Sequence, residues 1–133
     1  MHLRPAIIEL VVSDMAATLA FYRLLGTTIP ADADDQPHVD VELAGGLRLA
    51  FDTQDTIRSF DPGWSPPARG GHRVALAFGC DSPGDVDAAW DELTKAGYEG
   101  HLPPWDAFWG MRYAVVLDPN GVPVDLFAAS APA

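Results

Sequence analysis

Residues 103–127 constrain the fold more than any other part of the chain. Two short apolar runs, residues 111–117 and 122–127, flank the tetrapeptide Asp-Pro-Asn-Gly at 118–121. Proline pre-sets one turn dihedral, and Asn-Gly tolerates the positive φ of tight turns. The pattern therefore predicts a β-hairpin. Three large rings, Trp105, Phe108 and Trp109, stand within five residues just before it.

An order of strand, helix and strands appears twice along the chain. Residues 5–12 alternate and are rich in branched side chains, which predicts a strand. Residues 15–25 place apolar side chains at helical spacing between an N-cap, Asp14, and a stop, Gly26. Two strands are expected at 38–43 and 47–52. The order then returns with a strand at 73–78, a helix at about 85–96 and the hairpin.

Proline and glycine punctuate residues 53–71, so no long element is expected there. We expect a single domain over residues 1–133. It contains a first βαβββ module at 5–52, a connecting loop at 53–71 and a second βαβββ module at 73–127. Two helices cannot cover both faces of such sheets. The expected fold is therefore α+β, a curved mixed sheet around an open cleft that holds the functional site.

Composition narrows the range of partners. A net charge of -11 argues against nucleic acid, because phosphate binding needs a basic surface. The acidity serves either solubility or the attraction of cationic ligands. Cys80 is alone, which excludes an intramolecular disulfide. No apolar run approaches the roughly 20 residues of a membrane span, and residues 1–5 lack signal-peptide features, so we expect a soluble, cytoplasmic protein.

Residues 109–127, WGMRYAVVLDPNGVPVDLF, resemble the closing hairpin of the glyoxalase, bleomycin-resistance and dioxygenase superfamily, also called vicinal oxygen chelate proteins. The resemblance extends over roughly residues 5–127. Within the superfamily the chain looks most like the antibiotic-binding branch, especially the mitomycin-resistance proteins. That similarity lies in Ile29-Pro30, Gly45-Gly46, Phe51-Asp52-Thr53, residues 97–102 and Trp109-Gly110. The resemblance implies a homodimer with clefts at or near the subunit interface.

Metal enzymes of this superfamily take histidine or glutamate ligands from four strands. The resemblance places these positions at Ile7, Arg73, Asp125 and a residue near Leu49 or Phe51. At best one oxygen ligand remains, whereas a divalent site needs three or more. We therefore expect no metal and no other cofactor.

The rings and nearby charges suggest what the cleft binds. Trp105 and Trp109 can offer flat faces to a planar guest, although they can instead fill a core or a dimer seam. By resemblance, His38 helps to sandwich the ligand; otherwise it is a polar surface residue. Glu9 and Asp125 would suit a cationic guest, unless Asp125 pairs with Arg73 on a neighbouring strand.

These observations predict a metal-free protein that binds and sequesters a planar aromatic or cationic antibiotic-like compound, giving drug resistance by binding alone. No catalytic residue is expected. The expected ligand-binding residues are His38, Phe51, Trp105, Trp109, Met111 and Asp125. The alternative is an enzyme of the same superfamily. It would be a metal-dependent glyoxalase-type or dioxygenase-type lyase, or a cofactor-free isomerase with Asp125 or Glu9 as its base.

Overall fold

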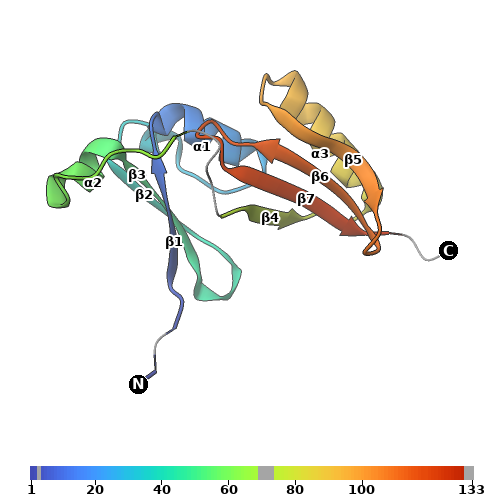
Figure 1. The fold of residues 1–133 in the computed structure, drawn as a ribbon, viewed down its shortest axis with the longest axis horizontal. Helices are drawn as coiled ribbons and strands as arrows, with labels where there is room; N and C mark the ends of the chain where they lie inside the picture. The colour runs from blue at the N-terminus through green and yellow to red at the C-terminus, as the bar shows by residue number, and fades with distance from the viewer. Residues whose placement is uncertain (3, 69–73, 131–133) are drawn as a thin grey trace. The chain divides into compact units, whose positions relative to one another are not determined.

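The computed structural model describes residues 1–2, 4–68 and 74–130 of the chain. They fall into two compact units, Met1–Pro67 and Ala68–Ala133. Figure 1 labels the helices and strands of both units. Each unit contains one mixed sheet with a helix packed on it, so the α+β fold class expected from the sequence is confirmed.

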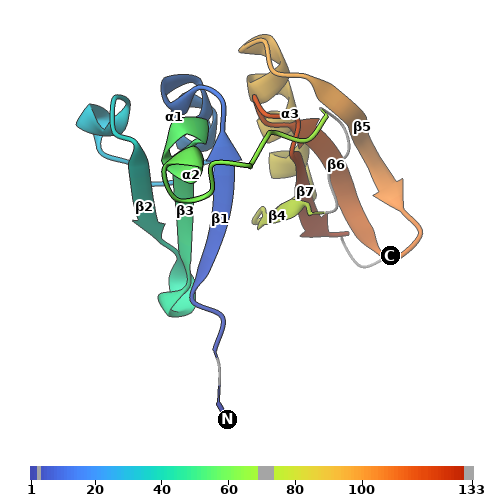
Figure 2. The same cartoon turned by 60° about the vertical axis from the view of Figure 1, so that its left-hand side comes forward.

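The first unit is built on a three-stranded sheet. Its elements are β1 (Ile7–Val12), α1 (Met15–Leu24), β2 (His38–Glu42), β3 (Arg48–Thr53) and α2 (Gln54–Phe60). The strand order is β1-β3-β2, with β1 parallel and β2 antiparallel to β3 (Figure 2). The sheet is thus mixed, as expected.

Side chains along the strands of this unit point alternately to the two faces of the sheet, and one of these faces forms the core with α1. Leu10, Val12 and Phe51 are buried together with Leu19 and Tyr22 of α1. The side chain of Asp14 accepts a hydrogen bond from the Ala17 backbone N–H at 3.0 Å, the N-cap that the sequence predicted. The next residues along each strand, starting with Glu9 and Asp52, point to the opposite face.

The first module differs from the expected βαβββ order in one strand. The described residues of this unit contain three strands where four were expected, and residues 27–36, between α1 and β2, contain a 3₁₀ turn at Ala31–Ala33. Arg23 of α1 binds this segment through the Pro30 carbonyl at 2.6 Å and the Asp34 carboxylate at 2.8 Å. A proline and a run of acidic residues favour such a turn over a ladder of hydrogen bonds.

Helix α2 lies inside the segment that was expected to be a loop. The Thr53 hydroxyl caps it by accepting a hydrogen bond from the Thr56 backbone N–H at 3.2 Å, and Ile57 is its buried residue. The helix has only seven residues. Over residues 53–68 no long element occurs, in agreement with the prediction, but the prediction missed this short helix.

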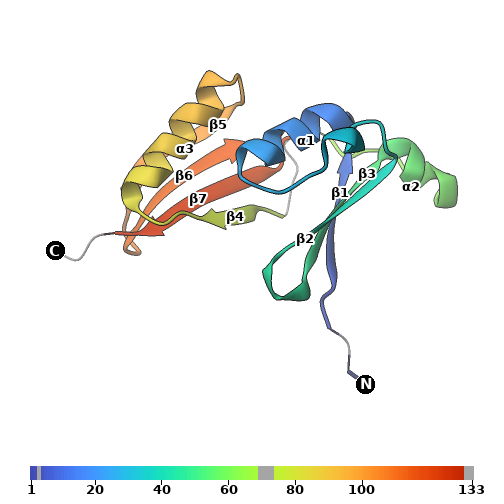
Figure 3. The ribbon, with the colours of Figure 1, turned by 180° about the vertical axis from the view of Figure 1, so that it is seen from behind.

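The second unit has the complete βαβββ order. Its elements are β4 (Leu76–Gly79), α3 (Pro83–Lys95), β5 (Gly100–Ala107), β6 (Met111–Leu117) and β7 (Pro123–Ala129). The strand order is β4-β7-β6-β5, with β4 parallel to β7 and the other neighbours antiparallel (Figure 3). The hairpin expected at 111–127 is β6 and β7. Arg73, where β4 was expected to begin, lies outside the described residues.

Helix α3 covers one face of this second sheet and contacts β5, β6 and β7. It begins at Pro83, two residues before the predicted start, because the Ser82 hydroxyl caps it by accepting from the Asp85 backbone N–H at 3.2 Å. Val86 and Leu93 are the buried residues of its inner stripe. Within residues 74–130, no helix lies on the other face of this sheet, which we call its helix-free face.

Candidate functional site

Strand alternation sorts the side chains of the second unit onto two faces. Val124, Leu126 and Ala128 of β7 are buried on the side of α3. Asp125 and Phe127 therefore point to the helix-free face. The ladder between β6 and β7 pairs Tyr113 with Phe127 and Val115 with Asp125, so these four side chains share that face.

Aromatic rings cluster on the helix-free face of the second unit. We call this surface the aromatic face; it consists of Trp105, Phe108, Trp109, Tyr113 and Phe127. The ring centroid of Tyr113 lies 5.4 Å from that of Trp105 and 5.3 Å from that of Trp109. Phe127 stacks on Tyr113 with centroids 6.4 Å apart. Each ring thus holds its neighbour in place.

The turn between β5 and β6 places the outermost rings of the aromatic face. Gly110 adopts φ 85°, and its N–H donates to the Ala107 carbonyl at 3.1 Å. Phe108 and Trp109 therefore occupy the turn itself, where Phe108 is 97% and Trp109 is 47% exposed. Within the chain, Trp109 is not a core residue. Its free surface is available to a planar ligand or to another chain.

Asp125 adds a carboxylate to the aromatic face. The Tyr113 hydroxyl donates to its Oδ2 atom at 2.5 Å. Burial, and secondly this hydrogen bond, raise the pKa of Tyr113 to about 12, so the hydroxyl stays a donor at neutral pH. The predicted alternative partner of Asp125, Arg73, lies outside the described residues.

Small side chains border the carboxylate. Ala77 and Gly79 of β4 pair with Asp125 and Phe127, and both are exposed. Leu76 and Phe78 alternate with them and are partly covered. The alternation therefore places the bulkier side chains of β4 on one face and the small ones beside Asp125. Met111 begins β6 on the same face as Tyr113 and is half-buried.

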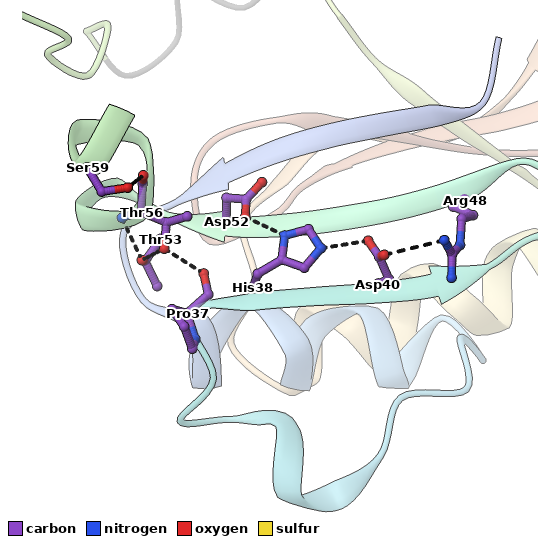
Figure 4. Close-up of polar contacts among 8 residues, drawn as sticks. All are labelled: Pro37, His38, Asp40, Arg48, Asp52, Thr53, Thr56 and Ser59. Carbon is purple, nitrogen blue, oxygen red and sulfur yellow. Dashed lines mark hydrogen bonds and ion pairs between the residues drawn. The ribbon is translucent and has the colours of Figure 1, made fainter. Parts of the chain in front are cut away.

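His38 lies in the first unit, on the face of its sheet opposite the core residues that pack on α1 (Figure 4). Its Nδ1 atom is 2.5 Å from Oδ1 of Asp52, and its Nε2 atom is 3.0 Å from Oδ1 of Asp40. The hydrogen bond with Asp52 is the largest cause of a raised His38 pKa. Burial and the neighbouring Asp52 raise the pKa of Glu9 on β1. His38 is therefore a member of a charged network. Its predicted contact with a ligand stays a prediction.

Phe51 does not fit the ligand-binding role that the sequence suggested. Its side chain is 0% exposed, and its ring centroid lies 5.2 Å from that of Tyr22 on α1. The alternation of β3 points it toward the helix. A ring in that position has no surface free for a guest, so its role is to pack the core.

The superfamily's metal positions carry few donor atoms here. Ile7 pairs with Arg48 in the β1–β3 ladder, while Leu49 and Phe51 are buried under α1. Within residues 1–2, 4–68 and 74–130, no three histidine, cysteine or acidic side chains are grouped so as to hold a metal ion. Arg73 lies outside this part of the chain. The metal-free state stays a prediction.

A shallow hollow of the first unit is another candidate binding surface. It is lined by Met15, Asp34, Asp35, Gln36, Pro37, Thr53, Asp55, Thr56 and Ser59. Its lining contains three carboxylates and no aromatic ring. It includes none of the predicted ligand-binding residues. The aromatic face is therefore the stronger candidate for binding a planar compound.

Comparison with known proteins identifies the family. The model of the Glyoxalase/Bleomycin resistance protein/Dioxygenase superfamily matches residues 4–126. The chain therefore belongs to this superfamily, and its α+β fold with two mixed sheets is the vicinal oxygen chelate fold. No curated protein matches the chain. None of the helices in the described ranges is both long and apolar enough to span a membrane.

Solved structures share this fold. A glyoxalase/bleomycin resistance protein/dioxygenase from Nocardioides is 26% identical; the match covers 100% of this chain and 89% of that one, with a TM-score of 0.73. A family enzyme from Burkholderia phytofirmans PsJN is 18% identical, with coverage of 93% and 97% and a TM-score of 0.79. A glyoxalase-related enzyme from Fulvimarina pelagi is 22% identical, with coverage of 94% and 87% and a TM-score of 0.78.

Proposed function

We propose that this protein binds and sequesters a small planar aromatic or cationic antibiotic-like compound on its aromatic face, without making or breaking bonds. The exposed ring cluster around a single carboxylate, on a sheet face with no helix of its own unit, is the observation that supports this proposal. Trp105, Trp109, Met111 and Asp125 are retained from the sequence prediction. Tyr113 and Phe127 are added to them.

The chemistry of this surface suits such a ligand. Each stacked or edge-on ring pair contributes about 0.5–1.5 kcal/mol beyond the burial of area. A micromolar complex requires about 8 kcal/mol in total. Two or three ring contacts, together with the burial of a drug-sized apolar surface at roughly 25 cal/mol per Å², supply a large part of that amount. Asp125 adds an acceptor for an ammonium group or a hydroxyl of the guest.

Resistance, a homodimer and a cytoplasmic location belong to the same proposal. They are supported by the resemblance to the antibiotic-binding branch, where binding alone protects the cell. An exposed Trp109 and Phe108 are also compatible with a second chain covering part of the aromatic face. Sedimentation analysis of the purified protein, with and without ligand, tests the dimer directly.

Titration of the protein with mitomycin-like, bleomycin-like and quinoxaline compounds, followed by tryptophan fluorescence, tests the binding function. We expect quenching by at least one class, and roughly tenfold weaker binding for Trp109→Ala, because about 1.4 kcal/mol of stacking is lost. Trp64→Ala is the matched control. Its ring packs against Arg58, 5.6 Å from the guanidinium carbon, and lies outside the aromatic face. Wild-type affinity in the Trp109 variant would refute the proposed role.

Metal analysis of the same preparation distinguishes this proposal from the metal-dependent alternative. A stoichiometric divalent ion that survives purification would favour a lyase or dioxygenase. Unchanged fluorescence titrations after treatment with a chelator would favour binding by the rings and the carboxylate alone.

A further inference from the structure

Six charged or titratable side chains lie on the face of the first unit's sheet opposite its α1-packed core; Glu42 pairs with Arg48 at one end, and the other five form a cluster. We call them the His38 network: Glu9 on β1, Arg48 and Asp52 on β3, and His38 and Asp40 on β2. Strand pairing brings them together, because His38 lies opposite Asp52 while Glu9 and Asp40 flank Ala50 from the two sides. Figure 4 shows the chain of contacts from Asp52 through His38 and Asp40 to Arg48.

Both ring nitrogens of His38 face carboxylate oxygens. The Nδ1–Oδ1 distance to Asp52 is 2.5 Å, and the Nε2–Oδ1 distance to Asp40 is 3.0 Å. An ionised carboxylate only accepts hydrogen bonds, and a neutral imidazole has a single N–H to donate. In one of the two contacts, the lone pair of the unprotonated ring nitrogen would then face a lone pair of the carboxylate oxygen. The arrangement therefore fits the imidazolium, which donates a hydrogen bond to Asp52 from Nδ1 and whose charge attracts Asp40 at Nε2.

In the described ranges, the carboxylates around His38 have few other cations near them that could balance their charge. The side chain of Asp52 is only 6% exposed. The buried Oδ1 of Asp40 makes no hydrogen bond with any residue in the described ranges, so its attraction to His38 depends on charge rather than on alignment. Arg48 lies 3.7 Å from the other oxygen of Asp40. Glu9 adds a further carboxylate beside Asp52.

We propose that the His38 network is a proton-operated clamp: the imidazolium holds β2 and β3 together across their charged face, and loss of its proton releases the clamp. This inference concerns the first unit alone and does not depend on the proposed ligand-binding function. On deprotonation, the two aspartates lose the cation between them; among the described residues, Arg48 still pairs with Asp40. The repulsion among Glu9, Asp40 and Asp52 then acts on all three strands.

The pH range follows from the directions of two pKa shifts. The Asp52 hydrogen bond is the largest cause that raises the His38 pKa, and it prevails over desolvation, which lowers it. A raised pKa in the folded state means that the clamp contributes fully below the ordinary value of about 6.5 and is lost as pH rises through the folded value. Burial raises the pKa of Glu9, so Glu9 acts in the same direction at lower pH.

NMR titration of the imidazole resonances combined with urea unfolding between pH 6 and pH 8.5 tests the clamp. We expect His38 to titrate above a free histidine, and the unfolding midpoint to fall as pH rises. His38→Gln should lose most of this fall. His101→Gln, at an exposed position of β5, should keep it. Asp52→Asn should lower the pH at which His38 titrates.

Two results would overturn the clamp. One is a His38 resonance that titrates at or below the pH of a free histidine in the wild-type protein. The other is an unfolding midpoint that falls equally with pH in the wild-type and His38→Gln proteins. If a variant fails to fold, the wild-type resonance alone decides, because it needs no substitution.

Discussion

At the scale of single residues, Gly100 of β5 lies against Trp90 of α3 because it has no side chain. An ideal Cβ on Gly100 would be 2.3 Å from the ring end of Trp90. Trp90 is half-buried, with its indole against the backbone of β5. The absence of a side chain at position 100 is what permits this contact.

Gly100→Ala should therefore lower the free energy of unfolding by about 1–2 kcal/mol, because the indole of Trp90 must turn out of its place and lose contacts. Urea unfolding followed by circular dichroism measures this change. Gly63→Ala is the matched control, since nothing lies within 4 Å of its Cβ position. Equal stability of the two variants would show that Trp90 adjusts freely.

At the scale of elements, the hairpin of β6 and β7 depends on one buried carboxylate. Asp118 is 1% exposed, and its Oδ1 accepts from the backbone N–H groups of Asn120 at 2.8 Å and Val122 at 2.9 Å. Gly121 completes the turn at φ 84°. The turn that the sequence indicated through Pro-Asn-Gly is thus closed by the residue before the proline.

Asp118→Ala should cost about 2–4 kcal/mol of unfolding free energy, because it leaves two backbone donors without an acceptor near the core. Asp118→Asn keeps an accepting oxygen, and we expect it to cost less. Denaturant unfolding of both variants measures the difference. An alanine variant no less stable than the asparagine variant would mean that water replaces the lost acceptor.

At the scale of the whole molecule, the chain has a net charge of -11, and its candidate site contains one of the carboxylates, Asp125. A field of that sign attracts cations over roughly a Debye length, about 10 Å at 0.1 M salt. It has little influence on a neutral guest. If the acidity attracts cationic ligands, their association rate should depend on salt concentration. If the acidity serves solubility alone, that rate should not depend on the charge of the ligand.

The association rate of a planar cationic dye should fall severalfold between about 0.02 and 0.3 M salt, whereas that of a neutral analogue of the same ring system should hardly change. Stopped-flow fluorescence measures both rates. Equal salt dependence for the two dyes would assign the acidity to solubility alone. Asp125→Asn then reports how much of the effect is local.

The sequence predicted more of the second unit than of the first. Its hairpin and helix follow strong local signals, namely the turn at 118–121 and apolar residues at helical spacing. In the first unit, the sequence did not indicate the short helix α2, because prolines and glycines follow it closely and favour a loop. The fourth strand of the first module was inferred from the repeat alone, and the described residues of this unit contain three strands.

By itself, the sequence determined the superfamily, the fold class and three of the rings on the aromatic face, because these rest on local patterns and on matches along the chain. Only the tertiary structure decided which neighbours each residue has. The strand pairings placed Tyr113 against Asp125, added Phe127 to the rings, removed Phe51 into the core and put His38 between two aspartates. Cross-strand register joins residues distant in the sequence, and no local pattern carries that information.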